Sequence, residues 1–146
     1  MARIGIITCS NCTQDLHCAS VVCLADMRKR KGFFQKYPQE EPLDLVGIIS
    51  CDGCPTMHAP QKILKRIRSI AEFRVEAIHF SYCMTELCPF KHKYVEVIRQ
   101  AYPDIELVMG THTPPLERQQ FQNDVREVLS ACRFSMTDII KGRPVK

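Results

Sequence analysis

The sequence lacks any long apolar run. No stretch approaches the ~18 consecutive apolar residues of a transmembrane helix, so no membrane partner is expected. The amino terminus also lacks the charged–apolar–small pattern of a signal peptide, because Arg3 is followed at once by a short strand-like run. The predicted location is therefore cytoplasmic.

The chain also lacks a concentrated charge of one sign. Its net charge is only +4, and the densest basic cluster, residues 28–31, has Asp26 before it and Glu40 and Glu41 after it. Such a cluster is typical of a solvated helix face, so no nucleic-acid partner is predicted. No repeat, low-complexity segment or linker divides the 146 residues, which predicts a single domain, 1–146.

What the sequence has in abundance is cysteine, nine residues in all. An odd number fits a framework of disulfides poorly. In the reducing cytosol, patterned cysteines indicate metal binding or catalysis rather than structural bridges.

Four short apolar runs alternate with helical patterns. The runs cover residues 3–8, 45–50, 77–82 and 105–109, and helices are expected over 18–37, from Pro55, from Pro89 and from Pro114-Pro115, with a short one near Met136–Ile140. This alternation predicts an α/β fold: a small doubly wound, flavodoxin-like or Rossmann-like parallel sheet of about four strands flanked by helices. The expected strand order is second, first, third, fourth.

Most of the cysteines follow the expected strands. Cys9 ends the first, Cys51 and Cys54 follow the second, and Cys83 and Cys88 follow the third, where they are expected to frame a four-residue loop. Parallel strands end at one edge of a sheet, and ligands bind at that edge in open α/β folds. The thiols are therefore expected to gather there. Two more cysteines within fifteen residues of the first strand, Cys18 and Cys23, join them, as does His112 in the loop after the fourth strand.

The sharpest local motif is Cys51-Asp52-Gly53-Cys54-Pro55. Two intervening residues let one bent loop aim both sulfurs at a single metal, and Gly53 can adopt backbone angles that other residues avoid. The same C-x-x-C spacing also serves dithiol redox chemistry, for which Cys54 near a helix start would be a stabilised thiolate. Both interpretations remain open at this point.

The predicted metal ligands are Cys9, Cys18, Cys23, Cys51, Cys54, Cys83, Cys88 and His112. Cys132 is expected to be a buried structural residue, and Cys12 is undecided, since it extends a Cys9-x-x-Cys12 pair but could be a simple loop thiol. His79 is expected to be a hydrogen-bonded core group, and His58 and His92 are expected to be exposed.

The order of these motifs resembles the CGGC-domain family over residues 3–112. The resemblance rests on Cys9, on the pair Cys18 and Cys23 ahead of residues 31–37, on the Cys51–Cys54 motif, on Cys83 with Cys88-Pro89, and on Gly110-Thr111-His112. Asp52 replaces the first glycine of the motif that names the family. The resemblance implies metal binding, with zinc suggested by the cysteines and histidines, and it implies no particular reaction.

Three functions follow as hypotheses. The first is a metal-binding protein that holds zinc, or alternatively an iron–sulfur cluster, through these thiolates. The second is a thiol or dithiol oxidoreductase or transferase that uses Cys51 and Cys54, with His112 as acid or base. The third is a metal or redox sensor. Whether the protein is an enzyme is left open, and so is the identity of any protein partner.

Overall fold

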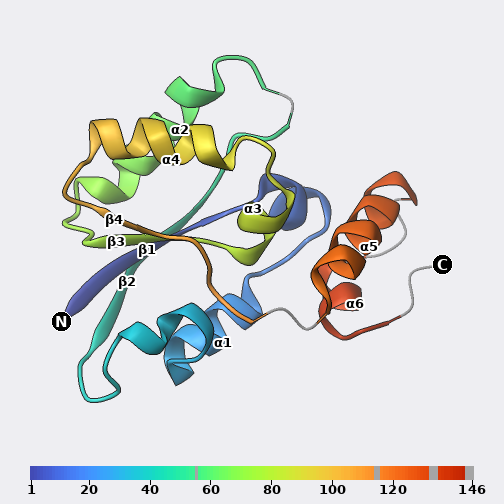
Figure 1. Ribbon diagram of the computed structural model, residues 1–146, viewed down its shortest axis with the longest axis horizontal. Coiled ribbons are helices and arrows are strands. Elements are labelled where there is room, and N and C mark those ends of the chain that lie inside the picture. Colours follow the sequence, from blue (N-terminus) through green and yellow to red (C-terminus); the bar gives the residue numbers. More distant parts are fainter. Residues whose placement is uncertain (55, 114–115, 132–134, 144–146) are drawn as a thin grey trace.

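A four-stranded parallel sheet lies at the centre of the protein (Figure 1). The computed structural model describes residues 1–54, 56–113, 116–131 and 135–143. The strands are β1 (Ala2–Thr8), β2 (Leu43–Ser50), β3 (Ala77–Phe80) and β4 (Glu106–Val108), in the order β2-β1-β3-β4. All three pairings are parallel. The predicted fold class and strand order are confirmed.

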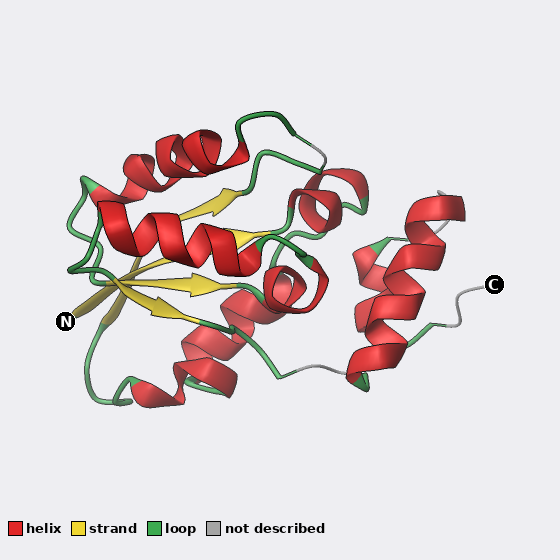
Figure 2. Ribbon diagram, turned by 45° about the horizontal axis from the view of Figure 1, so that its top comes forward, coloured by secondary structure: helices red, strands yellow, loops and turns green. Residues whose placement is uncertain are grey.

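Helices cover both faces of the sheet and its carboxyl edge. They are α1 (Val21–Lys29), α2 (Ala59–Ala71), α3 (Tyr82–Leu87), α4 (Lys91–Ala101), α5 (Arg118–Ala131) and α6 (Met136–Ile140), with a π-helical turn at Asn11–Asp15 and a 3-10 helix at Gly32–Lys36. In Figure 2, α2 and α4 lie on one face and α1 on the other, and the strands point toward α3 and the α5–α6 pair. None of these helices in the described ranges is long and apolar enough to cross a membrane.

Several predicted boundaries are wrong. The helix expected over 18–37 is two helices, because Arg30 adopts left-handed backbone angles (φ 52°) directly after α1. The third strand ends at Phe80, because the Ser81 hydroxyl accepts a hydrogen bond from Met84 N–H and caps α3. Cys83 therefore lies within α3 and Cys88 at its end. The two cysteines are joined by a helix and not by the expected loop.

Other boundary predictions concern the prolines. The helix expected from Pro55 begins at Ala59, and Pro60 occupies its first turn. Pro55 itself, Pro114-Pro115 and Cys132 lie outside the described residues, while α6 is found at Met136–Ile140 as expected.

β1 is buried on both faces, as its continuous apolar run predicts. Ile7 packs with α2 and α4 residues such as Ile63 and Ile98 on one side of the sheet. Ile4 and Ile6 pack with Phe34 on the other side. The central strand is thus held from both sides, which fixes the place where its carboxyl end, and Cys9, leave the sheet.

His79 is a buried, neutral core imidazole in β3. Its Nδ1 hydrogen bonds to the Gly110 carbonyl at 2.8 Å, so Nδ1 is the donor and Nε2 accepts from the Tyr37 hydroxyl at 2.8 Å. The ring stacks on Phe34 with centroids 4.4 Å apart. Burial lowers the pKa of His79 from 6.5 to about 4. The expectation of a hydrogen-bonded core histidine is confirmed, and His58 and His92 are exposed as expected.

Gly32 holds the loop that carries His112 against the 3-10 helix. Phe33 N–H donates to the Thr111 carbonyl at 2.9 Å. A Cβ at Gly32 would lie 2.6 Å from that carbonyl oxygen and 3.1 Å from His112 Cα, and Gly32 has φ +56°. Both neighbours are backbone atoms, so they cannot rotate away.

We therefore expect Gly32→Ala to destabilise the protein more than Gly142→Ala. Gly142 has a similar φ of +70° with open space around it, so the control carries the backbone strain without the clash. The difference in free energy of unfolding, measured with urea, should be about 1–3 kcal/mol, the usual cost of overpacking. If the two variants lost the same free energy of unfolding, residues 111–113 would be able to shift away from the added methyl group without cost.

Candidate metal centre at the carboxyl edge of the sheet

The cysteines gather where the strands end. All eight cysteines of the described residues are free thiols. Cys9 directly follows β1, Cys51 directly follows β2, and Cys83 lies in the first turn of α3, directly beyond β3. The topology of the sheet thus brings together sulfurs that are more than seventy residues apart in sequence, as Cys9 and Cys83 are.

The backbone at the end of β1 positions two of these sulfurs. Cys9 N–H donates to Cys83 Sγ at 3.4 Å, and the next amide, Ser10 N–H, donates to Cys51 Sγ at 3.3 Å. Successive amides of a strand point to opposite neighbours. Within the sheet, carbonyl oxygens of β3 and β2 accept hydrogen bonds from β1. Just beyond the end of β1, Cys83 Sγ accepts on the β3 side and Cys51 Sγ on the β2 side.

The thiol of Cys9 and three neighbouring thiols, those of Cys12, Cys51 and Cys83, interact with one another. The pKa of Cys83 lies well below the ordinary thiol value, because the thiols of Cys12 and Cys9 donate hydrogen bonds to it. The Ser81 hydroxyl, 2.8 Å from Cys83 Sγ, adds to this effect. The pKa of Cys9 is also lowered, since Cys12 and Cys51 donate to its sulfur.

The two donor thiols show the opposite shift. The pKa of Cys12 is raised by its hydrogen bonds to Cys83 and Cys9 and by burial, and the pKa of Cys51 is raised by its hydrogen bond to Cys9. The four thiols thus divide into two whose pKa is lowered, Cys9 and Cys83, and two whose pKa is raised, Cys12 and Cys51.

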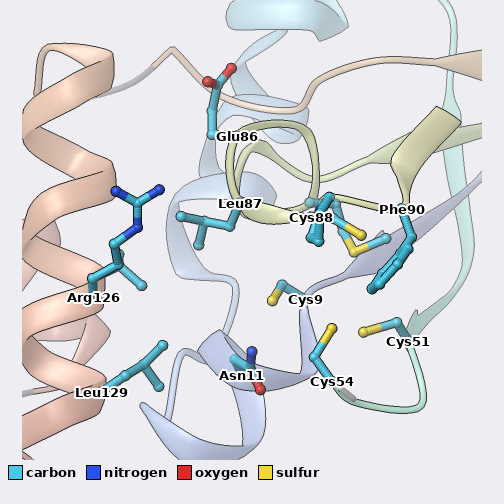
Figure 3. Close-up of a pocket in the computed structure, with 13 residues that line it drawn as sticks. Cys9, Asn11, Cys51, Cys54, Glu86, Leu87, Cys88, Phe90, Arg126 and Leu129 are labelled. Carbon is cyan, nitrogen blue, oxygen red and sulfur yellow. The ribbon is translucent and has the colours of Figure 1, made fainter. Parts of the chain in front are cut away.

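Four cysteines border one large cavity, which we call the sulfur pocket. Cys9, Cys51, Cys54 and Cys88 surround it (Figure 3), and its volume is about 390 Å³. Apolar side chains of α3 and α5 form much of the remaining wall. Burial raises the pKa of Cys54, which is nevertheless the exposed member, and raises that of Cys88 to about 11.

The other predicted ligands lie around a second pocket. Cys18, Cys23, Cys83 and His112 line this cavity of only about 20 Å³. Cys23 Sγ lies 3.3 Å from Thr111 Oγ1, and burial raises the pKa of Cys23 to about 12. His112 Nδ1 donates to the Thr113 carbonyl at 3.0 Å. The eight predicted ligands are thus divided between two pockets, and His112 does not line the pocket that holds Cys51 and Cys54.

Asp52 anchors the Cys51–Cys54 loop to α2. Its carboxylate accepts hydrogen bonds from Arg66 Nε and Nη2 at 3.1 and 2.5 Å, and Lys62 Nζ lies 3.3 Å away. Lys62 also donates to Thr56 Oγ1 at 2.6 Å. These contacts, Arg66 first, lower the pKa of Asp52. The carboxylate therefore pairs with α2 and does not line the sulfur pocket.

The thiols of the sulfur pocket are ligands of the type that thiophilic metals prefer, but their sulfur atoms do not converge on one position. Four thiols are the ligand set of structural zinc and of iron–sulfur clusters. In the described residues, no three Cys, His, Asp or Glu side chains are arranged to hold a metal ion. Metal binding at this pocket therefore requires side-chain rotation, for which exposed Cys54 has the most room.

Cys12 is the residue that the sequence analysis left undecided. It is fully buried and contacts both Cys9 and Cys83. The signal was present in the Cys9-x-x-Cys12 spacing, which places the second cysteine one helical turn from the first. Because a simple loop thiol was the alternative interpretation of Cys12, this spacing did not predict a contact.

Comparison with known proteins gives one family. The chain matches the CGGC domain over residues 3–112, which is most of its length. No curated protein and no solved structure matches it significantly. The matched segment contains all four cysteines of the sulfur pocket. The protein therefore belongs to the CGGC-domain family.

Proposed function

We propose that the protein binds a thiophilic metal in the sulfur pocket through Cys9, Cys51, Cys54 and Cys88. Zinc is the first candidate, and an iron–sulfur cluster is the alternative. The observation that carries the proposal is that four free thiols from three separate segments border one cavity. Family membership, which suggests metal binding, supports it independently.

Each thiol has a distinct part in this proposal. Cys9 is held at the end of the central strand, and interactions with neighbouring thiols lower its pKa, which favours the deprotonated form that a metal requires. Cys51 is held by Ser10 N–H, while Cys88, at the end of α3, and exposed Cys54 approach from the other walls. A bound metal would supply a fixed link between the loops after β1 and β2 and the end of α3.

Nucleophilic chemistry by the Cys51–Cys54 pair is less well supported. The pKa values of both thiols are raised, so neither is an activated thiolate at neutral pH. His112, the expected acid or base, lines the second pocket instead. We also infer a cytosolic location, since thiolate ligands and free cysteines persist in a reducing compartment.

The proposal is tested by metal analysis of protein purified without oxygen. We expect about one metal site per chain, colourless with zinc or brown with an iron–sulfur cluster. Zinc should also slow alkylation of Cys54 and Cys88 without changing that of Cys18, which is half-buried at the second pocket and serves as the internal control. Protein that contains no metal and gains no protection when zinc or iron and sulfide are supplied would refute the proposal.

A further inference from the structure

We propose that Cys9 and Cys12 form a dithiol pair that reduces a low-molecular-weight disulfide entering the sulfur pocket. Cys9 is the attacking thiol, and Cys12 is the resolving thiol. This activity does not depend on the proposed metal, and a metal bound to Cys9 would block it.

The turn after β1 places the two cysteines at bridging distance. Cys12 N–H donates to the Cys9 carbonyl at 3.1 Å, three residues back along the chain. Such a turn brings the two Cα atoms within ~7 Å of each other, the upper limit for a disulfide. Both side chains also belong to the same buried cluster. A bridge can therefore form with little backbone movement.

The positions of the two cysteines indicate which one attacks the substrate disulfide first. Cys9 lines the sulfur pocket, whereas Cys12 is 0% exposed and does not line it. A disulfide in the pocket can therefore reach Cys9 but not Cys12. Cys12 lies behind Cys9, where only an internal sulfur can reach it.

The sulfur pocket has room for a small substrate. Its volume of about 390 Å³ falls within the ~300–1,000 Å³ of small-molecule sites, whereas the second pocket has only about 20 Å³. Apolar walls from Met84, Leu87 and Phe90 suit the aliphatic part of a disulfide. Exposed Arg126 on α5 also lines the pocket and suits the carboxylates of a peptide-like thiol.

The exchange balances without another reactant. The Cys9 thiolate attacks the disulfide R–S–S–R′, forming Cys9–S–S–R and releasing R′–S⁻. The Cys12 thiol then gives up its proton as it attacks the Cys9 sulfur, which forms the Cys9–Cys12 disulfide and releases R–S⁻. The two protein thiols lose two electrons and two protons, and the substrate gains them as R–SH and R′–SH.

Oxidation of the reduced, metal-free 146-residue chain by glutathione disulfide tests this proposal. After alkylation of remaining thiols, cleavage before Asp15 yields fragment 1–14, in which Cys9 and Cys12 are the only cysteines. We expect this fragment to carry no alkyl group and to be lighter by two hydrogens than the same fragment with both thiols reduced. In Cys12→Ser the fragment should instead carry one glutathionyl group on Cys9, and in Cys9→Ser it should carry none. Cys18→Ser, which removes a thiol from the second pocket, is the matched control and should retain the internal bridge.

Fragment 1–14 alkylated at both cysteines in the folded wild-type protein would overturn the proposal. So would the lack of a trapped glutathionyl group in a folded Cys12→Ser variant. A second oxidation with zinc present separates the two proposals: oxidation unaffected by zinc would contradict metal binding at Cys9 while leaving the dithiol intact. Zinc protection of the thiols, together with the lack of a Cys9–Cys12 bridge in metal-free protein, would support metal binding and contradict the dithiol proposal.

Discussion

Replacing both Cys51 and Cys54 with serine is expected to lower zinc affinity by about 10⁴-fold. Structural zinc in small peptides is bound by about 10–16 kcal/mol, which is roughly 3 kcal/mol for each of four ligands. Two lost thiolates then correspond to roughly 6 kcal/mol, at about 1.4 kcal/mol per factor of ten. Competition against a chromophoric chelator measures this change.

The matched control is serine at both Cys18 and Cys23, which line the second pocket. It removes the same number of thiols from the same edge of the sheet, so zinc affinity should change by only a few fold. If the control loses zinc and the Cys51–Cys54 variant retains it, the metal site lies in the second pocket, with Cys83 and His112.

Acidification from pH 6.5 to 4 is expected to cost roughly 3 kcal/mol of stability through His79 alone. Burial lowers its folded pKa from 6.5 to about 4, so across this interval only the unfolded chain takes up the proton. The stabilising contribution is complete above pH 6.5 and is lost as the pH falls toward 4. The gap of about 2.5 pH units, at about 1.4 kcal/mol per unit, gives this magnitude.

Urea unfolding at several pH values isolates this contribution when wild type is compared with His79→Gln. The variant should be less stable at pH 7, because the hydrogen bonds to Tyr37 and Gly110 are disturbed. However, its stability should fall less steeply below pH 6.5. His92→Gln, at an exposed position on α4, is the control and should follow wild type. Parallel curves for wild type and His79→Gln would show that His79 is protonated in the folded state.

Much of the fold was predictable because it depends on apolar runs. Continuous runs such as Ile4–Ile7 belong to strands covered on both faces, and alternation with helices leads to a parallel sheet. The missed features depend on single backbone angles and caps. The left-handed angles of Arg30 end α1, and the Ser81 cap starts a helix of only six residues that apolar spacing does not reveal.

The candidate site was predictable only to the level of the sheet edge. Topology requires Cys9, Cys51 and Cys83 to emerge together, and they do. Beyond a strand end, however, the direction of a side chain depends on the local turn, which the spacing of cysteines does not determine. That is why the division between two pockets and the inward position of Cys12 could not be predicted.

The departure from the family motif has a local structural role. Asp52, where the motif has glycine, pairs with Arg66 and Lys62 on α2. The loop therefore has an ionic anchor beside its two cysteines, while Gly53, with φ +102° and no atom near its absent Cβ, keeps its conformational freedom. This combination anchors the beginning of the loop and leaves the segment before Cys54 able to bend.

The paired amides at the end of β1 limit which insertions and deletions this chain can tolerate. Cys9 N–H faces Cys83 and Ser10 N–H faces Cys51. Because strand neighbours alternate in direction, one residue added or removed between Ile7 and Ser10 would present each amide to the wrong side. Loops such as residues 38–42 can change length without this effect. The length of β1 is therefore under a constraint that comes from the sulfurs as well as from the hydrophobic core.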